Sequence, residues 1–245
     1  MDEFGMNSVD PNFAIDFDES LVPVRDIRQA RQSSVDFDGL LETPLLLQED
    51  LKKGCGGQLW PAGMVLAKYL LNQHRSSLAN NSIIELGSGG GLVGLAIARG
   101  CQIGPSPVII TDQAPMLPLM ETNIKLNKLS DLVTATILNW GENIPDCIPP
   151  KPSIILAADC VYFEPAFPLL ISTLKDLLGP DSTCYFCFRK RRRADLRFMK
   201  MARKLFIIEE VQDDPDAETY RSENIFLYTI RRKSSWNSIS NLAAV

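Results

Sequence analysis

The stretch Ile83-Ile84-Glu85-Leu86-Gly87-Ser88-Gly89-Gly90-Gly91-Leu92-Val93-Gly94 decides the fold of this chain. Its β-branched start predicts a short strand, its glycines predict a tight turn, and the apolar run that continues to Ala98 has the length of a helix. Glycine permits backbone conformations closed to other residues, and the unpaired N–H groups at a helix start face a ligand. The stretch therefore predicts a nucleotide-type cofactor site.

Two classes of cofactor fit this glycine pattern. Gly89, Gly91 and Gly94 satisfy the G-x-G-x-x-G pattern of dinucleotide-binding domains, and Asp112 follows at about the distance of a ribose-binding acid. Read from Glu85, the order E-x-G-x-G-x-G instead resembles motif I of the S-adenosyl-L-methionine (AdoMet) methyltransferases. The Glu85 carboxylate would repel a pyrophosphate and attract the ammonium group of a methionine moiety, which favours AdoMet. A nicotinamide site and a glycine turn without a ligand remain alternatives.

Composition restricts the class of protein. A chain of 245 residues, 45% hydrophobic and 22% charged, holds one sizeable α/β domain with an extension. No apolar run approaches the roughly twenty residues of a membrane span, and the acidic start lacks the features of a secretory signal. We therefore expect a cytoplasmic protein without membrane contact. The six scattered cysteines and the single histidine, His74, provide little support for a metal site.

Charge is distributed unevenly along the chain. Residues 1–50 hold twelve acidic and three basic side chains, so they carry a formal charge of −9 and the remainder carries +4. This distribution weakens a nucleic-acid-binding interpretation, and we expect no direct nucleic-acid contact. The one basic run, Arg189–Arg193, is most often the solvated end of a strand, with a nuclear signal or a phosphate patch as alternatives.

The remaining sequence predicts an α/β fold: a Rossmann-like, mostly parallel seven-stranded sheet with helices on both faces. The last two strands follow each other without an intervening helix and predict a C-terminal antiparallel hairpin, which distinguishes the methyltransferase form of this fold from the dehydrogenase form. We expect an acidic, partly disordered extension over residues 1–50, the domain over 51–233 and a tail over 234–245. The predicted strands are 82–86, 108–111, 134–138, 154–158, 183–189, 206–211 and 224–230, and the predicted helices are 61–72, 92–99, 116–126, 166–178 and 195–205.

Acidic and aromatic residues follow several predicted strands. Asp112 ends the second strand beside the glycine loop, where it can accept hydrogen bonds from both hydroxyls of a ribose; a helix N-cap is its alternative role. Trp140 follows the third strand, where its ring can flank an adenine or belong to the core. Asp159 and Tyr162 follow the apolar strand 154–158 at the same edge.

These last two residues suggest the chemistry. Methyl transfer from a sulfonium is an in-line displacement, so the protein must position a neutral nucleophile and exclude water. A lysine amine has an unperturbed pKa of about 10.4, so its uncharged form must be favoured. We expect Asp159 to hold the ammonium and orient the amine, and Tyr162 to supply a hydroxyl or an aromatic wall. A capping aspartate and a packed tyrosine are the structural alternatives.

With these residues given, the chain resembles methyltransferase family 16, the seven-strand protein-lysine methyltransferases, and within it the fungal elongation factor methyltransferases. The resemblance covers residues 57–233. It rests on the joint occurrence of Leu59-Trp60-Pro61-Ala62, Glu85-Leu86-Gly87-Ser88-Gly89, Asp112, Trp140 and Asp159-x-x-Tyr162. Gly90 departs from the family, where Thr or Ala is commoner.

The resemblance implies an AdoMet-dependent protein-lysine N-methyltransferase with a protein substrate, translation elongation factor 1-alpha, and we expect a monomer. It implies a substrate-side role for Asp159 and Tyr162, and AdoMet contacts at Trp60, Gly87, Ser88, Gly89, Asp112, Trp140 and Ala158, to which we add Glu85. Methylation of another nucleophile, in a small molecule or a protein histidine, stays open, as does a non-catalytic AdoMet-binding or nicotinamide-binding domain.

Overall fold

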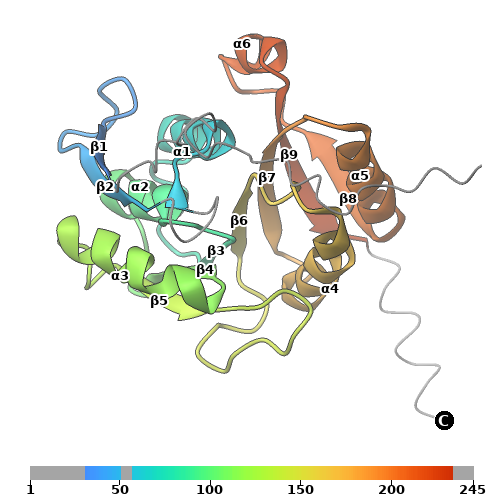
Figure 1. The fold of residues 1–245 in the computed structure, drawn as a ribbon, viewed down its shortest axis with the longest axis horizontal. Helices are drawn as coiled ribbons and strands as arrows, with labels where there is room; N and C mark the ends of the chain where they lie inside the picture. Colours follow the sequence, from blue (N-terminus) through green and yellow to red (C-terminus); the bar gives the residue numbers. More distant parts are fainter. Residues whose placement is uncertain (1–30, 51–56, 234–245) are drawn as a thin grey trace, which may run out of the picture.

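A computed structural model describes residues 31–50 and 57–233, and its centre is a seven-stranded sheet in the order β5-β4-β3-β6-β7-β9-β8 (Figure 1). β9 runs antiparallel to both β7 and β8, and the other neighbouring strands pair in parallel. The predicted, mostly parallel sheet with an antiparallel C-terminal pair is confirmed. Its strands are β3 (Ile83–Leu86), β4 (Val108–Asp112), β5 (Val133–Ile137), β6 (Ile154–Ala158), β7 (Thr183–Arg189), β8 (Phe206–Glu210) and β9 (Ile225–Arg232).

Helices cover both faces of this sheet, which is why β3 is buried along its whole length. Figure 1 shows α1, α2 and α3 on one side and α4 and α5 on the other. Two hydrophobic clusters result, one between the sheet and α1, α2 and α3, and one between the sheet and α4 and α5. These helices are α1 (Pro61–Gln73), α2 (Leu92–Gly100), α3 (Leu117–Leu126), α4 (Phe167–Leu177) and α5 (Arg193–Leu205), and the 3-10 turns Ala114–Met116 and Glu164–Ala166 precede α3 and α4.

The connection between the last two strands differs from the prediction. A sixth helix, α6 (Ala217–Ser222), lies between β8 and β9, so the expectation of a connection without a helix is wrong. None of its six residues is buried, and Asp214, whose carbonyl accepts a hydrogen bond from the Ala217 N–H, closes the turn before it. A short polar helix of this kind carries no apolar periodicity that a sequence pattern can reveal.

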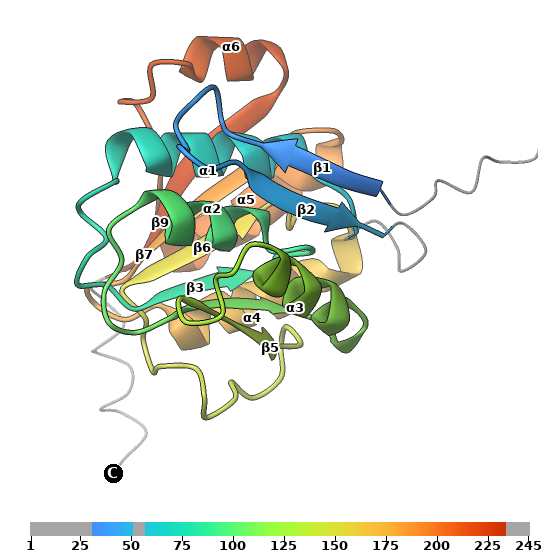
Figure 2. The same cartoon turned by 90° about the vertical axis from the view of Figure 1, so that its left-hand side faces the viewer.

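Residues that precede the predicted domain also contribute to the core. The antiparallel pair β1 (Arg31–Val35) and β2 (Leu45–Glu49) lies along the face that carries α2 and α3 (Figure 2), and Leu45 and Leu47 are fully buried. The extension predicted over residues 1–50 therefore supplies residues 31–50 to the folded unit. Residues 1–30, 51–56 and 234–245, with most of the predicted acidic arm and the whole tail, lie outside the described residues.

Further features of the described residues are the surroundings of His74, the arrangement of side chains that could bind a metal ion, and the length and polarity of the helices. His74 follows α1, and its ring lies between Tyr69 and Tyr185, hydrogen-bonded to both hydroxyls. Within residues 31–50 and 57–233, no cluster of three or more His, Cys, Asp or Glu side chains is arranged to hold a metal ion. Over the same residues, every helix is too short or too polar to cross a bilayer.

Candidate functional site

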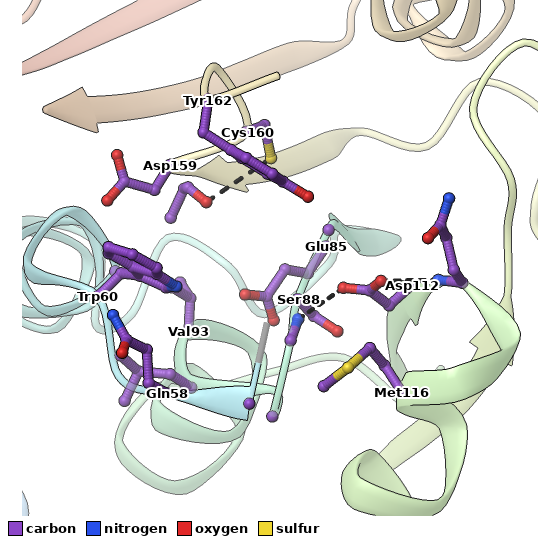
Figure 3. A pocket seen from close by; sticks show the side chains of 18 of the residues that line it. Gln58, Trp60, Glu85, Ser88, Val93, Asp112, Met116, Asp159, Cys160 and Tyr162 are labelled. Carbon is purple, nitrogen blue, oxygen red and sulfur yellow. Dashed lines mark hydrogen bonds between the residues drawn. The ribbon is translucent and has the colours of Figure 1, made fainter. Parts of the chain in front are cut away.

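One cavity of about 880 Å³ opens at the carboxyl ends of β3, β4 and β6, a volume typical of a site for a cofactor-sized ligand. Parallel strands of a doubly wound sheet place their ligands at this edge. All ten predicted site residues line this cavity, and Figure 3 labels several of them around the opening: Trp60, Glu85, Gly87, Ser88, Gly89, Asp112, Trp140, Ala158, Asp159 and Tyr162. The structure thus brings all ten predicted residues together, whereas their individual roles stay predictions.

The glycine loop between β3 and α2 forms the floor of this cavity. Gly87, Gly89 and Gly91 have φ angles of +60°, +56° and +87°, in the left-handed region that favours glycine. A Cβ atom on Gly87 would lie 2.9 Å from Cζ2 of Trp140 and 3.1 Å from Sγ of Cys160. A side chain at this position would therefore fill the space in which the loop backbone meets the Trp140 ring.

Glu85 is the penultimate residue of β3 and lies beneath this loop. Its side chain is buried, and its Oε2 accepts a hydrogen bond of 2.8 Å from the Gly94 N–H at the start of α2. Burial raises the pKa of Glu85 to about 8, although the backbone N–H groups of Gly94 and Val93 oppose the shift. At neutral pH the carboxyl is therefore mainly protonated in the free protein, and a cation in the cavity would favour its ionised form.

Asp112 ends β4 on the other side of the loop (Figure 3). One carboxylate oxygen accepts the Gly89 N–H at 2.8 Å, and the other accepts the Gln113 N–H at 2.7 Å. Burial raises the pKa of Asp112, and these two hydrogen bonds oppose the rise. Because a carboxylate has about four acceptor positions, each oxygen retains one for a ligand such as a pair of vicinal hydroxyls.

Asp159 directly follows β6 and has a left-handed backbone with a φ angle of +54°. Its N–H donates to the Cys187 carbonyl at 2.8 Å, and its Oδ1 accepts the Arg189 N–H at 3.0 Å, so both its backbone and its side chain are bonded to β7. The carboxylate lies on the Trp60 side of the cavity, across from Glu85 and Asp112 (Figure 3). Tyr162, by contrast, is 53% exposed at the rim.

Two further residues at the cavity escaped the sequence analysis. Arg191 donates from both terminal nitrogens to the Asp159 carboxylate, at 3.0 and 2.8 Å. Asn123 on α3 is fully buried, and its amide donates to the Gly90 carbonyl at 2.9 Å, which holds the glycine loop from behind. In the sequence, Asn123 could have been found only as an amide among the apolar residues of α3, which the structure shows to be buried. Arg191 lies inside a basic run, where nothing in the sequence distinguishes it from its neighbours.

Comparison with known proteins assigns the family. Residues 40–205 match the family described as lysine methyltransferase. The chain belongs to this family. The expected family and enzyme class are thereby confirmed, and since lysine methyltransferases of this family use AdoMet, so is the predicted cofactor.

Named relatives of this lysine methyltransferase are identical to it at about a third of the aligned positions. The protein-lysine N-methyltransferase EFM6 of Saccharomyces cerevisiae is 33% identical over 89% of this chain and 97% of its own. The protein N-lysine methyltransferase METTL21A of Danio rerio is 34% identical over 85% of this chain and 94% of its own. The EEF1A lysine methyltransferase 3 of Mus musculus is 30% identical over 74% of each chain.

A solved structure supports the fold of the lysine methyltransferase. The T. thermophilus 16S rRNA N2 G1207 methyltransferase RsmC, solved with AdoMet and guanosine, superposes with a TM-score of 0.56 at 12% identity. The match covers 84% of this chain and 50% of that one, so the chain spans about half the length of that protein. At this identity the likeness shows the methyltransferase fold alone.

Proposed function

We propose that this lysine methyltransferase transfers a methyl group from AdoMet to a lysine of translation elongation factor 1-alpha. The observation that carries the proposal is the convergence of the glycine loop, Asp112, Asp159 and Tyr162 on one cavity at the edge of the sheet. The mouse relative named for EEF1A supports this substrate, whereas the name of EFM6 gives none. The name of METTL21A also gives no substrate, so a lysine of another protein is the second candidate target.

The cavity suits AdoMet in size and in chemistry. The left-handed glycines let the loop backbone approach a ligand, and the two free acceptor positions of Asp112 match the hydroxyls of a ribose. Trp140 lies against Gly87 and presents an apolar ring for an adenine, while Glu85 lies where an ammonium group would favour its ionised form. Trp60, Ser88 and Ala158 complete the predicted contacts. When bound, AdoMet supplies an electrophilic methyl group.

Besides binding AdoMet, the protein must bind the amine of the target lysine. The target lysine must lose a proton before its nitrogen lone pair can attack, so the site has to orient an uncharged amine and exclude water. We assign this task to the rim between Trp60, Asp159 and Tyr162, which lies beside the loop. Asp159 belongs to a network that fixes the direction of its carboxylate, and the exposed Tyr162 is available to cover an incoming side chain.

The test is to add this protein and AdoMet with a labelled methyl group to a lysate of cells that lack the protein. Peptide mass spectrometry then identifies the labelled molecules. We expect label on a lysine of elongation factor 1-alpha. Label on a histidine or only in small molecules would favour the other nucleophiles, and label on a lysine of another protein would keep the enzyme class and replace the substrate.

A matched pair of variants tests Asp159. The substitution Asp159→Asn keeps the size of the side chain and removes its charge, and we expect it to lower transfer about 100-fold while AdoMet affinity stays within about threefold of wild type. Asp181→Asn makes the same change in an exposed turn at the opposite edge of the sheet and should leave transfer unchanged. Undiminished transfer in Asp159→Asn would remove the proposed role.

We further propose that the protein acts as a monomer in the cytoplasm, where the substrate factor works. Sedimentation velocity of the full chain and fractionation of cells that produce it test the two statements. A dimer at micromolar concentration, or a nuclear pool that depends on residues 189–193, would contradict them.

A further inference from the structure

The basic run Arg189–Arg193 faces the cavity with only part of its side chains. The guanidinium group of Arg191 binds the carboxylate of Asp159, and that of Arg192 donates to the carbonyl of Tyr162 at 2.5 Å. The side chain of Lys190 is exposed. Two arginines of the run therefore bind the segment that follows β6. In this the run differs from a strand end that contacts only water.

Arg191 connects two walls of the cavity. Its guanidinium carbon lies 5.1 Å from the centre of the Trp60 ring, within range of a cation–π interaction, while its nitrogens bind Asp159 in bidentate fashion. The Asp159 side chain is 5% exposed and that of Arg191 is 31% exposed, so the carboxylate is buried and the guanidinium group covers it from the solvent side. Through one side chain, Arg191, two residues after β7, thus contacts both Asp159, which follows β6, and Trp60, which precedes α1.

We infer that Arg191 is a positioning residue of the methyl-transfer site, which holds Asp159 and Trp60 in place and sets the charge that the target amine meets. The inference rests on the proposed function and deepens it. A bidentate guanidinium defines the plane of the carboxylate more strictly than a single hydrogen bond does. Its positive charge also compensates the buried negative charge of Asp159.

The local charges show why this compensation matters. Asp195 is fully buried, and its carboxylate is already bonded to the backbone N–H groups of Arg191 and Arg192 and to the Arg192 guanidinium. The buried thiol of Cys187, on β7, is held neutral because burial raises its pKa. Glu85 and Asp112 lie across the cavity, and Arg189 reaches away to the Glu223 carbonyl. Among the residues that the structure describes, Arg191 is therefore the cation that forms an ion pair with Asp159.

Loss of this cation would have a defined effect on the reaction. The rim would carry an uncompensated negative charge, which stabilises the protonated form of an incoming lysine and raises the pKa of its ammonium group. A higher pH would then be needed to deprotonate the nucleophile. A role in packing alone would lower the rate without moving its dependence on pH.

The experiment compares Arg191→Gln, Arg191→Lys and the control Lys190→Gln in the full-length protein. Glutamine keeps one hydrogen-bond donor for Asp159 and loses the charge, whereas lysine keeps the charge and loses the bidentate geometry. The measurements are AdoMet affinity by calorimetry and the pH profile of kcat/KM for methyl transfer to the protein substrate.

We expect Arg191→Gln to lower kcat/KM about tenfold and to move the midpoint of its pH profile upward by about one unit, with AdoMet affinity within about threefold of wild type. Arg191→Lys should lower kcat/KM but keep the wild-type midpoint, and Lys190→Gln should change neither quantity. An unshifted midpoint in Arg191→Gln, or an equal shift in Arg191→Lys, would overturn the inference while the proposed function stands. Wild-type protein that binds AdoMet and methylates no protein would overturn the proposed function and the inference with it.

Discussion

Two of the segments that form the cavity contain residues with left-handed backbone conformations. Gly87, Gly89 and Gly91 lie in the loop after β3, and Asp159 adopts the same conformation after β6. For an aspartate this conformation is less favourable than for glycine, and it persists because the Cys187 carbonyl holds its backbone N–H and the Arg189 N–H holds its carboxylate. Strain at the site is thus balanced by hydrogen bonds to β7.

The first residue-scale prediction concerns Gly87→Ala. A methyl group at this position meets the Trp140 ring at 2.9 Å in addition to the cost of the left-handed backbone, so we expect AdoMet affinity to fall at least about tenfold. Gly39→Ala is the control, because Gly39 has a φ angle of +81° with no atom within 4 Å of the added carbon. It should cost about 1 kcal/mol of stability and leave AdoMet affinity unchanged. Calorimetric titration and urea unfolding measure both quantities.

The second residue-scale prediction concerns Glu85, whose titration makes the stability of the folded protein depend on pH. Its folded pKa of about 8 lies above the ordinary value of 4.5, so the folded protein binds more protons than the unfolded chain between these values. The free energy of unfolding that this group contributes is present at low pH and is lost as the pH rises through that window. We expect Glu85→Gln to gain stability relative to wild type between pH 5 and about pH 8, while the exposed control Glu121→Gln should follow wild type. Parallel urea midpoints for Glu85→Gln and wild type would contradict this assignment.

At the scale of elements, two side-chain amides, one on α3 and one directly after it, form hydrogen bonds to the edge of β2 that another strand would otherwise form. The Asn127 side chain accepts the Leu46 N–H at 2.9 Å and donates to the Leu46 carbonyl at 2.7 Å. The Asn123 side chain bonds in the same way to the N–H and carbonyl of Gln48. The edge of β2 is thereby satisfied without another strand, and the same Asn123 holds the glycine loop.

This arrangement predicts the effect of Asn127→Ala. The substitution leaves two backbone groups of Leu46 without their partner, and we expect a loss of about 2 kcal/mol in the free energy of unfolding, which lowers Tm by roughly 4–8 °C. Asn81→Ala removes a solvent-exposed hydrogen bond to the Ser77 carbonyl and should cost less than about 0.5 kcal/mol. Equal losses in the two variants would show that the link between β2 and α3 adds no stability.

At the scale of the whole molecule, binding of the cofactor must stabilise the folded state. At a concentration 100-fold above its Kd, AdoMet should add about 2.7 kcal/mol and raise Tm by roughly 5–11 °C. The nicotinamide dinucleotide NAD at the same concentration should leave Tm unchanged. If NAD raised Tm and AdoMet did not, the result would instead support the dinucleotide-binding interpretation of Gly89, Gly91 and Gly94.

Sequence patterns predicted the parallel part of this molecule well, for a physical reason. β6 and β7 are buried on both faces and read as continuous apolar runs, and their predicted bounds agree with the structure. The polar helix α6 has no such signal. Most of the ten site residues lie at or just after the carboxyl ends of parallel strands, where the sheet topology brings them together, whereas Trp60 precedes α1. The bidentate bond between Arg191 and Asp159 joins residues 32 positions apart, and only the folded chain reveals it.

The strand order also has a consequence for synthesis of the protein. β3 pairs with β4 on one side, but its other neighbour is β6, and Ile83 meets Ile154, which lies 71 residues further along the chain. At translation rates of about 5–20 residues per second, the second edge of β3 stays open for roughly 4–14 s on the ribosome. An apolar strand with an unpaired edge is a template for wrong pairing. The nascent chain therefore passes through a period in which a chaperone has a defined target, and that period ends when β6 emerges.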